Sequence, residues 1–272
     1  MTTAWDLLPS FRRAREFRLY DGARRYLDLW QEDGHALLGH RPGRVRLQIK
    51  QQLDRGLIAA YPSLEANRLV RALSDLLPER AAFRWFVNVA RFRGFISELI
   101  GGVTPSEIVD PAVIDDESES IMVWRPWLGQ ASRRARIVLP VIPMPGAGWL
   151  RIVGVTDELS EEFYPSDPVS PCWLSAVRSS VYALKSHLET FDSAVWTYFD
   201  CALWFRRGPY LRLRCEPARF RSLYREFLSH GMILSPEWSK PSIAPSVFDS
   251  GEVNPIHDIA AKQETAWKTP PS

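Results

Sequence analysis

Apolar residues recur at helical spacing in several segments of the chain. Val45, Ile49 and Leu53 fall on one face between residues 44 and 53, and Gly56 follows them. After Ser63, a suitable N-cap, a second apolar stripe precedes Pro78 and consists of Leu69, Val70, Leu73, Leu76 and Leu77. These patterns predict helices over 44–53 and 64–77. Similar patterns predict helices over 90–100, 171–188, 217–229 and 251–267, and Ser170 and Pro171 mark the start of the second of these four.

Alternating or continuous apolar runs predict the strands. Residues 17–29 indicate two short strands around a turn at Asp21 and Gly22. Further strands are expected over 83–87, 136–141, 149–155 and 232–234, and a strand pair over 195–205 and 210–215 turns at Gly208. Residues 107–119 hold six carboxylates and no basic residue, which predicts a solvated loop. Strands that alternate with helices favour an α/β or α+β fold.

Length and charge narrow the class of protein. The chain has 272 residues, enough for one large or two small domains, and a net charge of +2. Such a balance gives no electrostatic reason to expect nucleic acid or a membrane as a partner. No apolar run approaches the ~20 residues of a membrane span, and residues 1–10 do not resemble a secretory signal. We therefore expect a cytoplasmic protein.

Few residues are arranged for chemistry. The three cysteines (Cys172, Cys201 and Cys215) match no zinc or redox spacing, and the five histidines are scattered, so neither a disulfide nor a metal site is expected. Tryptophan and arginine interleave in residues 124–127 and 204–207. Such groups stack on nucleic-acid bases, but core aromatics beside snorkelling arginines are the more common arrangement. Nucleic-acid binding is therefore retained only as an alternative.

The N-terminal third resembles a known enzyme family. The segments 19–22, 25–29, 38–40 and 44–53 are similar to the opening of class III aminotransferases, which are fold-type I enzymes that use pyridoxal phosphate. Residues 55–57 and 61–65 (Arg-Gly-Leu and Tyr-Pro-Ser-Leu-Glu) most resemble glutamate-1-semialdehyde aminomutase within that family. Residues 71–78 and 83–88 resemble the helix and strand that follow.

The C-terminal part carries the same resemblance. Residues 220–227 and 230–236 are similar to a helix, a glycine and a short strand of the family's C-terminal domain, and residues 242–245 and the helix near Ile256 fit its end. The matches cover about half of the chain. The resemblance implies that residues 17–57 contact residues 210–267.

Three functional features of the family have no counterpart in this sequence. The resemblance implies a phosphate-binding Ser-Gly-Thr-Glu-Ala-like segment after the strand, but Asn88 runs directly into Val89 and Ala90. It also implies an Asp-Glu-Val sequence, whose aspartate pairs with the cofactor ring nitrogen, and a Gly-Lys for the Schiff base. The sequence contains no Asp-Glu-Val, and no glycine directly precedes any of the five lysines, Lys50, Lys185, Lys240, Lys262 and Lys268. Pyridoxal chemistry needs both groups.

The sequence therefore predicts a shortened α/β relative of the fold-type I transferases with a reduced large domain. We expect residues 1–78 to pack with a C-terminal small domain (201–272), and residues 79–200 to form the remnant of the large domain. The predicted function is that of a non-catalytic aminotransferase homologue, with no catalytic, cofactor-binding or metal-binding residues, no cofactor and an action through protein contacts. A divergent pyridoxal-phosphate aminotransferase or aminomutase is the alternative, and a nucleic-acid-binding protein is the second.

Protein contacts are suggested by the large apolar side chains. A reduced large domain is expected to uncover apolar surface, which implies self-association or binding to another chain. The tryptophans that either line such a surface or fill a repacked core are Trp124, Trp127, Trp149, Trp173, Trp196 and Trp204.

Overall fold

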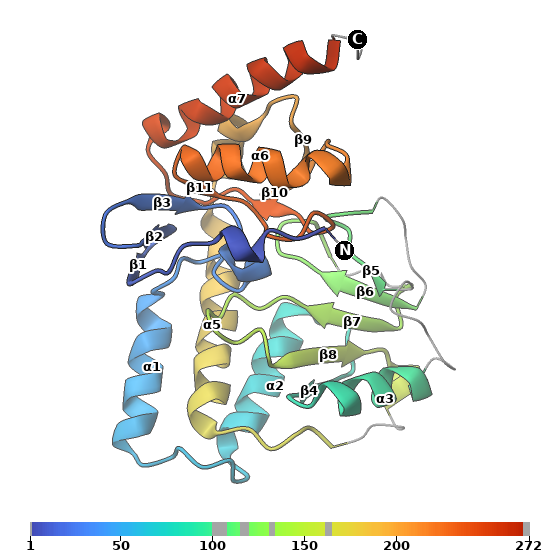
Figure 1. Cartoon of the computed structure of the whole chain (residues 1–272). Coiled ribbons are helices and arrows are strands. Elements are labelled where there is room, and N and C mark those ends of the chain that lie inside the picture. Colours follow the sequence, from blue (N-terminus) through green and yellow to red (C-terminus); the bar gives the residue numbers. More distant parts are fainter. Residues whose placement is uncertain (1, 100–107, 115–119, 131–133, 161–164, 269–272) are drawn as a thin grey trace. The chain divides into compact units, whose positions relative to one another are not determined.

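A computed structural model describes residues 2–99, 108–114, 120–130, 134–160 and 165–268 (Figure 1). The chain forms two compact units. Unit 1 consists of Met1–Arg41 and Asp192–Ser272, and unit 2 consists of Pro42–Phe191. Residues 42–78 thus belong to the same unit as residues 79–191, while the expected division into three segments stays a prediction.

The first sheet of unit 1 joins the two ends of the chain. Its strands are β1 (Arg13–Arg15), β2 (Arg18–Tyr20), β3 (Arg25–Asp28) and β11 (Met232–Ile233), in that order. β1, β2 and β3 pair antiparallel, and β11 pairs parallel to β3, with Met232 opposite Leu27. The predicted hairpin is confirmed, and so is the contact between the two ends, for residues 25–28 and 232–233.

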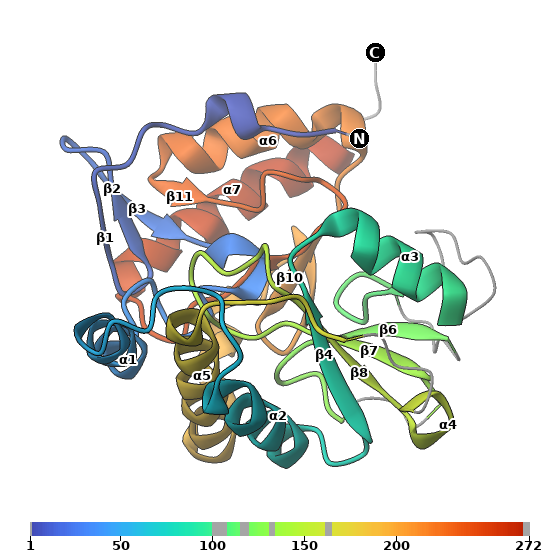
Figure 2. The ribbon, with the colours of Figure 1, turned by 90° about the horizontal axis from the view of Figure 1, so that it is seen from below.

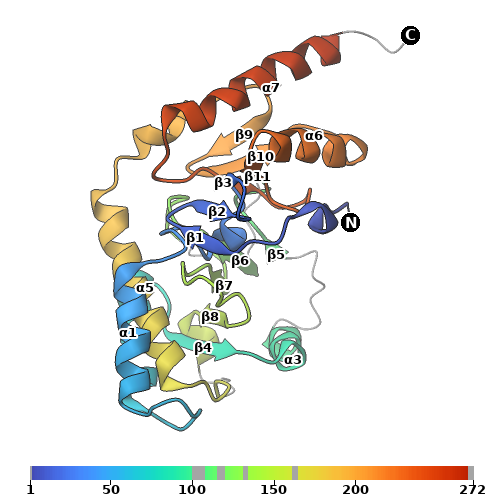
Figure 3. The same ribbon diagram turned by 60° about the vertical axis from the view of Figure 1, so that its left-hand side comes forward.

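A second sheet and two helices complete unit 1. The sheet order is β12 (Ser242–Ile243), β10 (Tyr210–Leu213) and β9 (Trp204–Arg207). Helix α6 (Pro217–Ser229) lies between β11 and helix α7 (Ser250–Lys268) (Figure 3). Short 3-10 helices are η1 (Trp5–Leu7), η2 (Gln31–Gly34) and η4 (Ser193–Phe199). The strand expected from residue 195 is therefore wrong over its first part, because Asp192 caps η4 by accepting from Ala194 N at 2.9 Å.

Unit 2 is built on a five-stranded sheet. The strand order is β4 (Ala82–Phe86), β8 (Arg151–Val155), β7 (Ile137–Pro140), β6 (Ile121–Trp124) and β5 (Ile108–Val109). β8 runs antiparallel to β4 and β7, whereas β7, β6 and β5 run parallel. The carboxyl ends of β4, β5, β6 and β7 therefore share one edge of the sheet, called here the carboxyl edge.

Helices cover both faces of this sheet. The helices of unit 2 are α1 (Gly43–Asp54), α2 (Leu64–Leu76), α3 (Val89–Leu99), α4 (Asp157–Ser160) and α5 (Pro171–Thr190), and α1 packs against α5. Figure 2 shows α2 and α5 on one side of the strands and α3 on the other. On the α3 side, Phe95 and Ile96 pack in one buried cluster with Phe86, Ile121 and Val153. The predicted strands and helices of this unit are confirmed. β5, β6 and α4 were not predicted, and β5 lies within residues 107–119, where a loop was expected.

The six tryptophans singled out by the sequence divide between the interior and the surface, with Trp127 and Trp173 half-buried. Trp124, Trp196 and Trp204 are buried, whereas Trp149 is exposed. Cys172 and Cys215 are buried as well, and burial raises the pKa of both thiols. In the part of the chain that the structure describes, no helix is both long and apolar enough to cross a membrane.

Candidate functional site

The carboxyl edge of the sheet in unit 2 is the place to examine for a ligand site. In open α/β sheets, ligands bind outside the carboxyl ends of the parallel strands. Asn88 lies just past the end of β4, Asp110 follows β5 directly, Arg125 follows β6 and Val141 follows β7. Polar groups that could bind a ligand are therefore present on three of the four strands.

Asn88 caps the N-terminus of α3. Its Oδ1 accepts hydrogen bonds from Ala90 N at 2.8 Å and from Arg91 N at 3.1 Å. These amide groups belong to the first turn of the helix, where N–H groups without an intrahelical partner attract anions. The side chain of Asn88 thus satisfies two donors that a bound phosphate would use.

A buried carboxylate takes up the next donors. Asp167 is only 3% exposed, and its Oδ2 accepts from Val87 N at 2.8 Å and from Asn88 N at 3.0 Å. Its Oδ1 forms an ion pair with Arg91. Two main-chain amides and one guanidinium therefore converge on an anion that belongs to the chain itself.

Main-chain and indole hydrogen bonds fix Asp167 beside β4. Asp167 N donates to Trp85 O at 2.9 Å, and Trp85 Nε1 donates to Asp167 O at 3.0 Å. Trp85 N also donates to Ser166 Oγ at 3.3 Å. Residues 166–167 thus continue the hydrogen bonding beyond β4, which is the last strand on this side of the sheet.

A second ion pair, in which the arginine is buried, lies in the middle of the carboxyl edge. The side chain of Arg125 is 2% exposed, and its Nε and Nη2 donate to the two oxygens of Asp110 at 2.8 and 2.6 Å. Asp110 Oδ1 also accepts from Ala112 N at 3.0 Å. Two expectations are corrected here: Asp110 is not a solvated acid, and Arg125 is buried in a bidentate pair instead of snorkelling to the surface.

An aromatic cluster lies next to this pair along the chain. Trp127 adopts a φ of 64°, a left-handed conformation that is uncommon for a bulky residue. Its ring meets His187 of α5 edge-on, with 5.5 Å between the centroids, and it also contacts Phe191. Burial lowers the pKa of His187, so the imidazole is neutral at pH 7 and packs as an aromatic group.

No lysine lies on a strand of the unit 2 sheet. No lysine occurs between residues 51 and 184, the stretch that contains every strand of this sheet. Lys50 is exposed on α1, and Lys185 lies on α5. In unit 1, Lys240 pairs with Asp33 at 2.9 Å, Lys262 lies 4.0 Å from Glu226, and Lys268 ends α7. Lysine is thus absent from the strands of the unit 2 sheet and from the residues that directly follow them.

The described residues contain no group of three or more His, Cys, Asp or Glu side chains that could hold a metal ion. One histidine, His40, does have an acidic partner. Its Nε2 lies 2.9 Å from Oδ2 of Asp28, a buried carboxylate that also accepts from Trp30 N and Gln31 N. This pair fastens the loop after η2 to strand β3 within unit 1.

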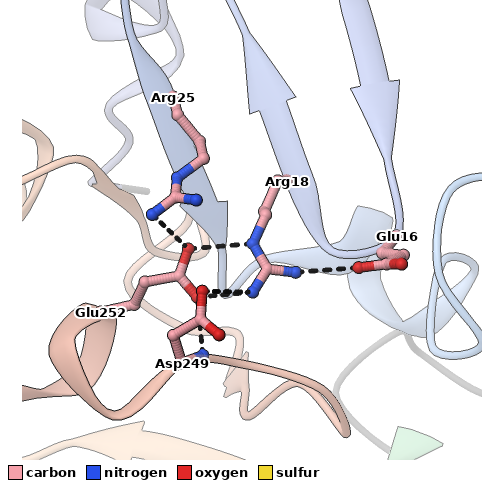
Figure 4. Close-up of polar contacts among 5 residues, drawn as sticks. All are labelled: Glu16, Arg18, Arg25, Asp249 and Glu252. Carbon is pink, nitrogen blue, oxygen red and sulfur yellow. Dashed lines mark hydrogen bonds and ion pairs between the residues drawn. The ribbon is translucent and has the colours of Figure 1, made fainter.

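The largest charged cluster of unit 1 is structural (Figure 4). Arg18 on β2 donates from Nε and Nη2 to both oxygens of Glu252 on α7, at 2.9 and 2.6 Å, and from Nη1 to Glu16 at 3.1 Å. Arg25 and the amide of Asp249 add further contacts to Glu252, at 3.2 and 2.9 Å. The cluster joins the N-terminal hairpin to the first turn of α7.

This cluster predicts a loss of stability in acid. Burial raises the pKa of Glu252, but the hydrogen bond from Arg18, the Asp249 amide and the two arginine charges outweigh it, so the pKa is lowered from its usual 4.5. A carboxyl with a lowered folded-state pKa stabilises the fold fully above its unfolded-state pKa and loses this contribution as the pH falls through the folded value. We expect the free energy of unfolding, measured in urea from about pH 7 to about pH 3, to fall less steeply in Glu252→Gln than in the wild type. Parallel curves would contradict this assignment.

Comparison with known proteins places the fold. No family model matches the chain. A curated relative, an uncharacterized protein of Borreliella burgdorferi, is 28% identical over 256 residues, which are 92% of this chain and 89% of the relative. Among solved structures, ornithine aminotransferase PY00104 from Plasmodium yoelii matches with a TM-score of 0.68 at 13% identity, over 97% of this chain and 96% of that chain.

Two further structures agree with this match. An omega-transaminase from Sphaerobacter thermophilus has a TM-score of 0.64 at 11% identity, covering 98% of this chain and 93% of its own. Acetylornithine aminotransferase from Elizabethkingia anophelis has a TM-score of 0.65 at 9% identity, covering 93% and 94%. The chain therefore has the α/β fold of the pyridoxal-phosphate-dependent aminotransferases, as the sequence predicted. At these identities the matches show the fold alone.

The residues at the carboxyl edge do not fit the cofactor of that fold. The amides at the start of α3 already donate to Asn88 and Asp167, and the charge of Asp167 opposes a phosphate there. Asp110, an aspartate that directly follows a parallel strand, already has both of its carboxylate oxygens bonded to Arg125. The sequence signal for Asp110 is the apolar pair Ile108 and Val109 ahead of it, which the acidic run obscured.

Proposed function

We propose that this chain is a non-catalytic protein with the aminotransferase fold, one that forms no Schiff base with pyridoxal phosphate. The observation that carries the proposal is the seating of Asp167 at the N-terminus of α3, where its carboxylate accepts from two main-chain amides and pairs with Arg91. A cofactor phosphate at this position would have to displace a buried, hydrogen-bonded anion.

The absence of lysine from residues 51–184 supports the same proposal. The internal aldimine requires a lysine amine at the reacting carbon of the cofactor. The nearest lysines in the sequence, Lys50 and Lys185, lie on helices and not at strand ends. The proposal also includes a shortened large domain, a specific relation to glutamate-1-semialdehyde aminomutase and a cytoplasmic location.

The absorbance of the purified protein tests this proposal. A protein-bound aldimine absorbs between about 330 and 430 nm, and we expect no such band either as purified or after incubation with excess pyridoxal phosphate followed by gel filtration. Variants Lys50→Arg and Lys185→Arg serve as matched controls. A band that survives gel filtration and disappears in one of these variants would establish the alternative, a divergent aminotransferase or aminomutase.

We further propose that the protein acts through self-association, because one segment of unit 2 exposes many apolar side chains. Tyr61 and Leu64 are 76% and 70% exposed, and the stretch from the last turn of α1 to the start of α2 also includes exposed Leu53, Leu57 and Ile58. Contiguous exposed apolar surface marks interaction sites on soluble proteins. In a two-fold symmetric dimer, the same patch is buried on both copies. The net charge of +2 causes little electrostatic repulsion between the two copies.

Sedimentation velocity at micromolar concentrations tests self-association. We expect a dimer for the wild type and a monomer for the double variant Ile58→Asp/Tyr61→Asp, with Val247→Asp in unit 1 as an exposed apolar control that leaves the dimer intact. A wild-type monomer would overturn the proposal. The nucleic-acid alternative has less support, because Trp124, Arg125 and Trp204 are buried and not available for stacking on bases.

A further inference from the structure

We infer that Asp167 is the resident anion of an anion-binding position at the start of α3: the chain supplies from its own sequence the negative charge for which this position is built. The inference rests on the proposed function and deepens it. On this inference, the phosphate does not bind because the carboxylate of Asp167 occupies its position at the start of α3. The missing binding segment is then only part of the explanation.

The donors around Asp167 form a built site. Val87 N and Asn88 N donate to Oδ2 at 2.8 and 3.0 Å, and Arg91 pairs with Oδ1. Arg91 also donates to Pro165 O at 3.3 Å, which holds its guanidinium toward the segment that carries Asp167. Successive main-chain amides and a guanidinium at a helix N-terminus are the groups that hold small oxyanions in proteins.

The carboxylate of Asp167 is buried, and hydrogen bonds of its main chain hold the residue in place. Asp167 is 3% exposed, and its own amide and carbonyl are both bonded to Trp85. A buried charge is tolerated only when it is paired and hydrogen-bonded, and every contact given for this carboxylate is with a donor. Removing it should therefore leave a vacant position that still favours an anion.

Chemical rescue by formate tests this inference. Formate is a free carboxylate small enough for the space that Asp167→Gly opens. Thermal unfolding is measured for wild type and variant in sodium formate and in sodium chloride of equal ionic strength. We expect the formate-specific rise of the unfolding midpoint to be at least about three times larger in the variant than in the wild type, because an anion that binds only the folded state raises its stability.

Two further variants keep the test decisive. Asp167→Ser leaves room for an anion with less backbone freedom, so it replaces Asp167→Gly if the glycine variant does not fold. Asp157→Gly removes an exposed carboxylate elsewhere in unit 2 and should respond equally to formate and chloride.

Equal responses to formate and chloride in Asp167→Gly and Asp167→Ser would overturn the inference, and so would a formate-specific response of the same size in the wild type. These outcomes leave the proposed function standing, because that proposal fails only if the wild type forms an aldimine.

Discussion

Replacing Arg125 by alanine is expected to lower the free energy of unfolding by about 3 to 5 kcal/mol. The guanidinium is buried and pairs with both oxygens of Asp110, so its removal leaves a largely buried carboxylate without its counter-charge. The same change also empties volume at the carboxyl edge of the sheet. Urea unfolding of the variant at neutral pH measures the loss.

The double variant Arg125→Met/Asp110→Leu is the control for this prediction. Replacing both partners of a buried ion pair by apolar groups of similar size is often neutral or stabilising. We therefore expect the double variant to be more stable than Arg125→Ala. A single variant within about 1 kcal/mol of wild type would show that the pair does not stabilise the fold as described.

Replacing Trp204 by alanine is expected to cost about 3 to 5 kcal/mol as well. The indole is buried, donates from Nε1 to Phe199 O at 2.6 Å and packs against Phe227 with 6.0 Å between the ring centroids. Trp149→Ala is the matched control, because that side chain is exposed, and it should cost less than about 1 kcal/mol. Urea unfolding compares the two variants, and similar losses in both would contradict the division of the tryptophans into core and surface.

The sequence predicted much of the fold because its local signals agree with the tertiary structure. Ser170 and Pro171 begin α5, and Ser170 Oγ accepts from Cys172 N at 3.2 Å, as an N-cap does. Glycines are further local signals of this kind: Gly22 lies in the turn of the hairpin, and Gly56 and Gly231 follow the ends of α1 and α6. The residues of β11 and β3 were matched only through the family resemblance, because no local pattern specifies a parallel pairing between residues about two hundred positions apart.

The candidate site was not predicted, because its contacts join residues that are distant in sequence. Asp167 lies 76 residues from Arg91, and Asp110 lies 15 residues from Arg125, inside an acidic run that suggested solvent. From Asn88 followed by Val89, the sequence did predict that a phosphate-binding segment is missing. The contacts of Asp167, which we propose takes the place of a bound phosphate, become visible only in three dimensions.

The central claim is that this fold has exchanged its cofactor for internal ion pairs, and reductive trapping tests it most directly. The native protein is incubated with pyridoxal phosphate and treated with borohydride, which converts any imine to a stable secondary amine, and its intact mass and labelled peptides are then determined. The account predicts no more labelling of the native protein than of the urea-unfolded chain, spread over its lysines. One stoichiometric adduct on a single lysine, formed only in the native protein, would contradict it.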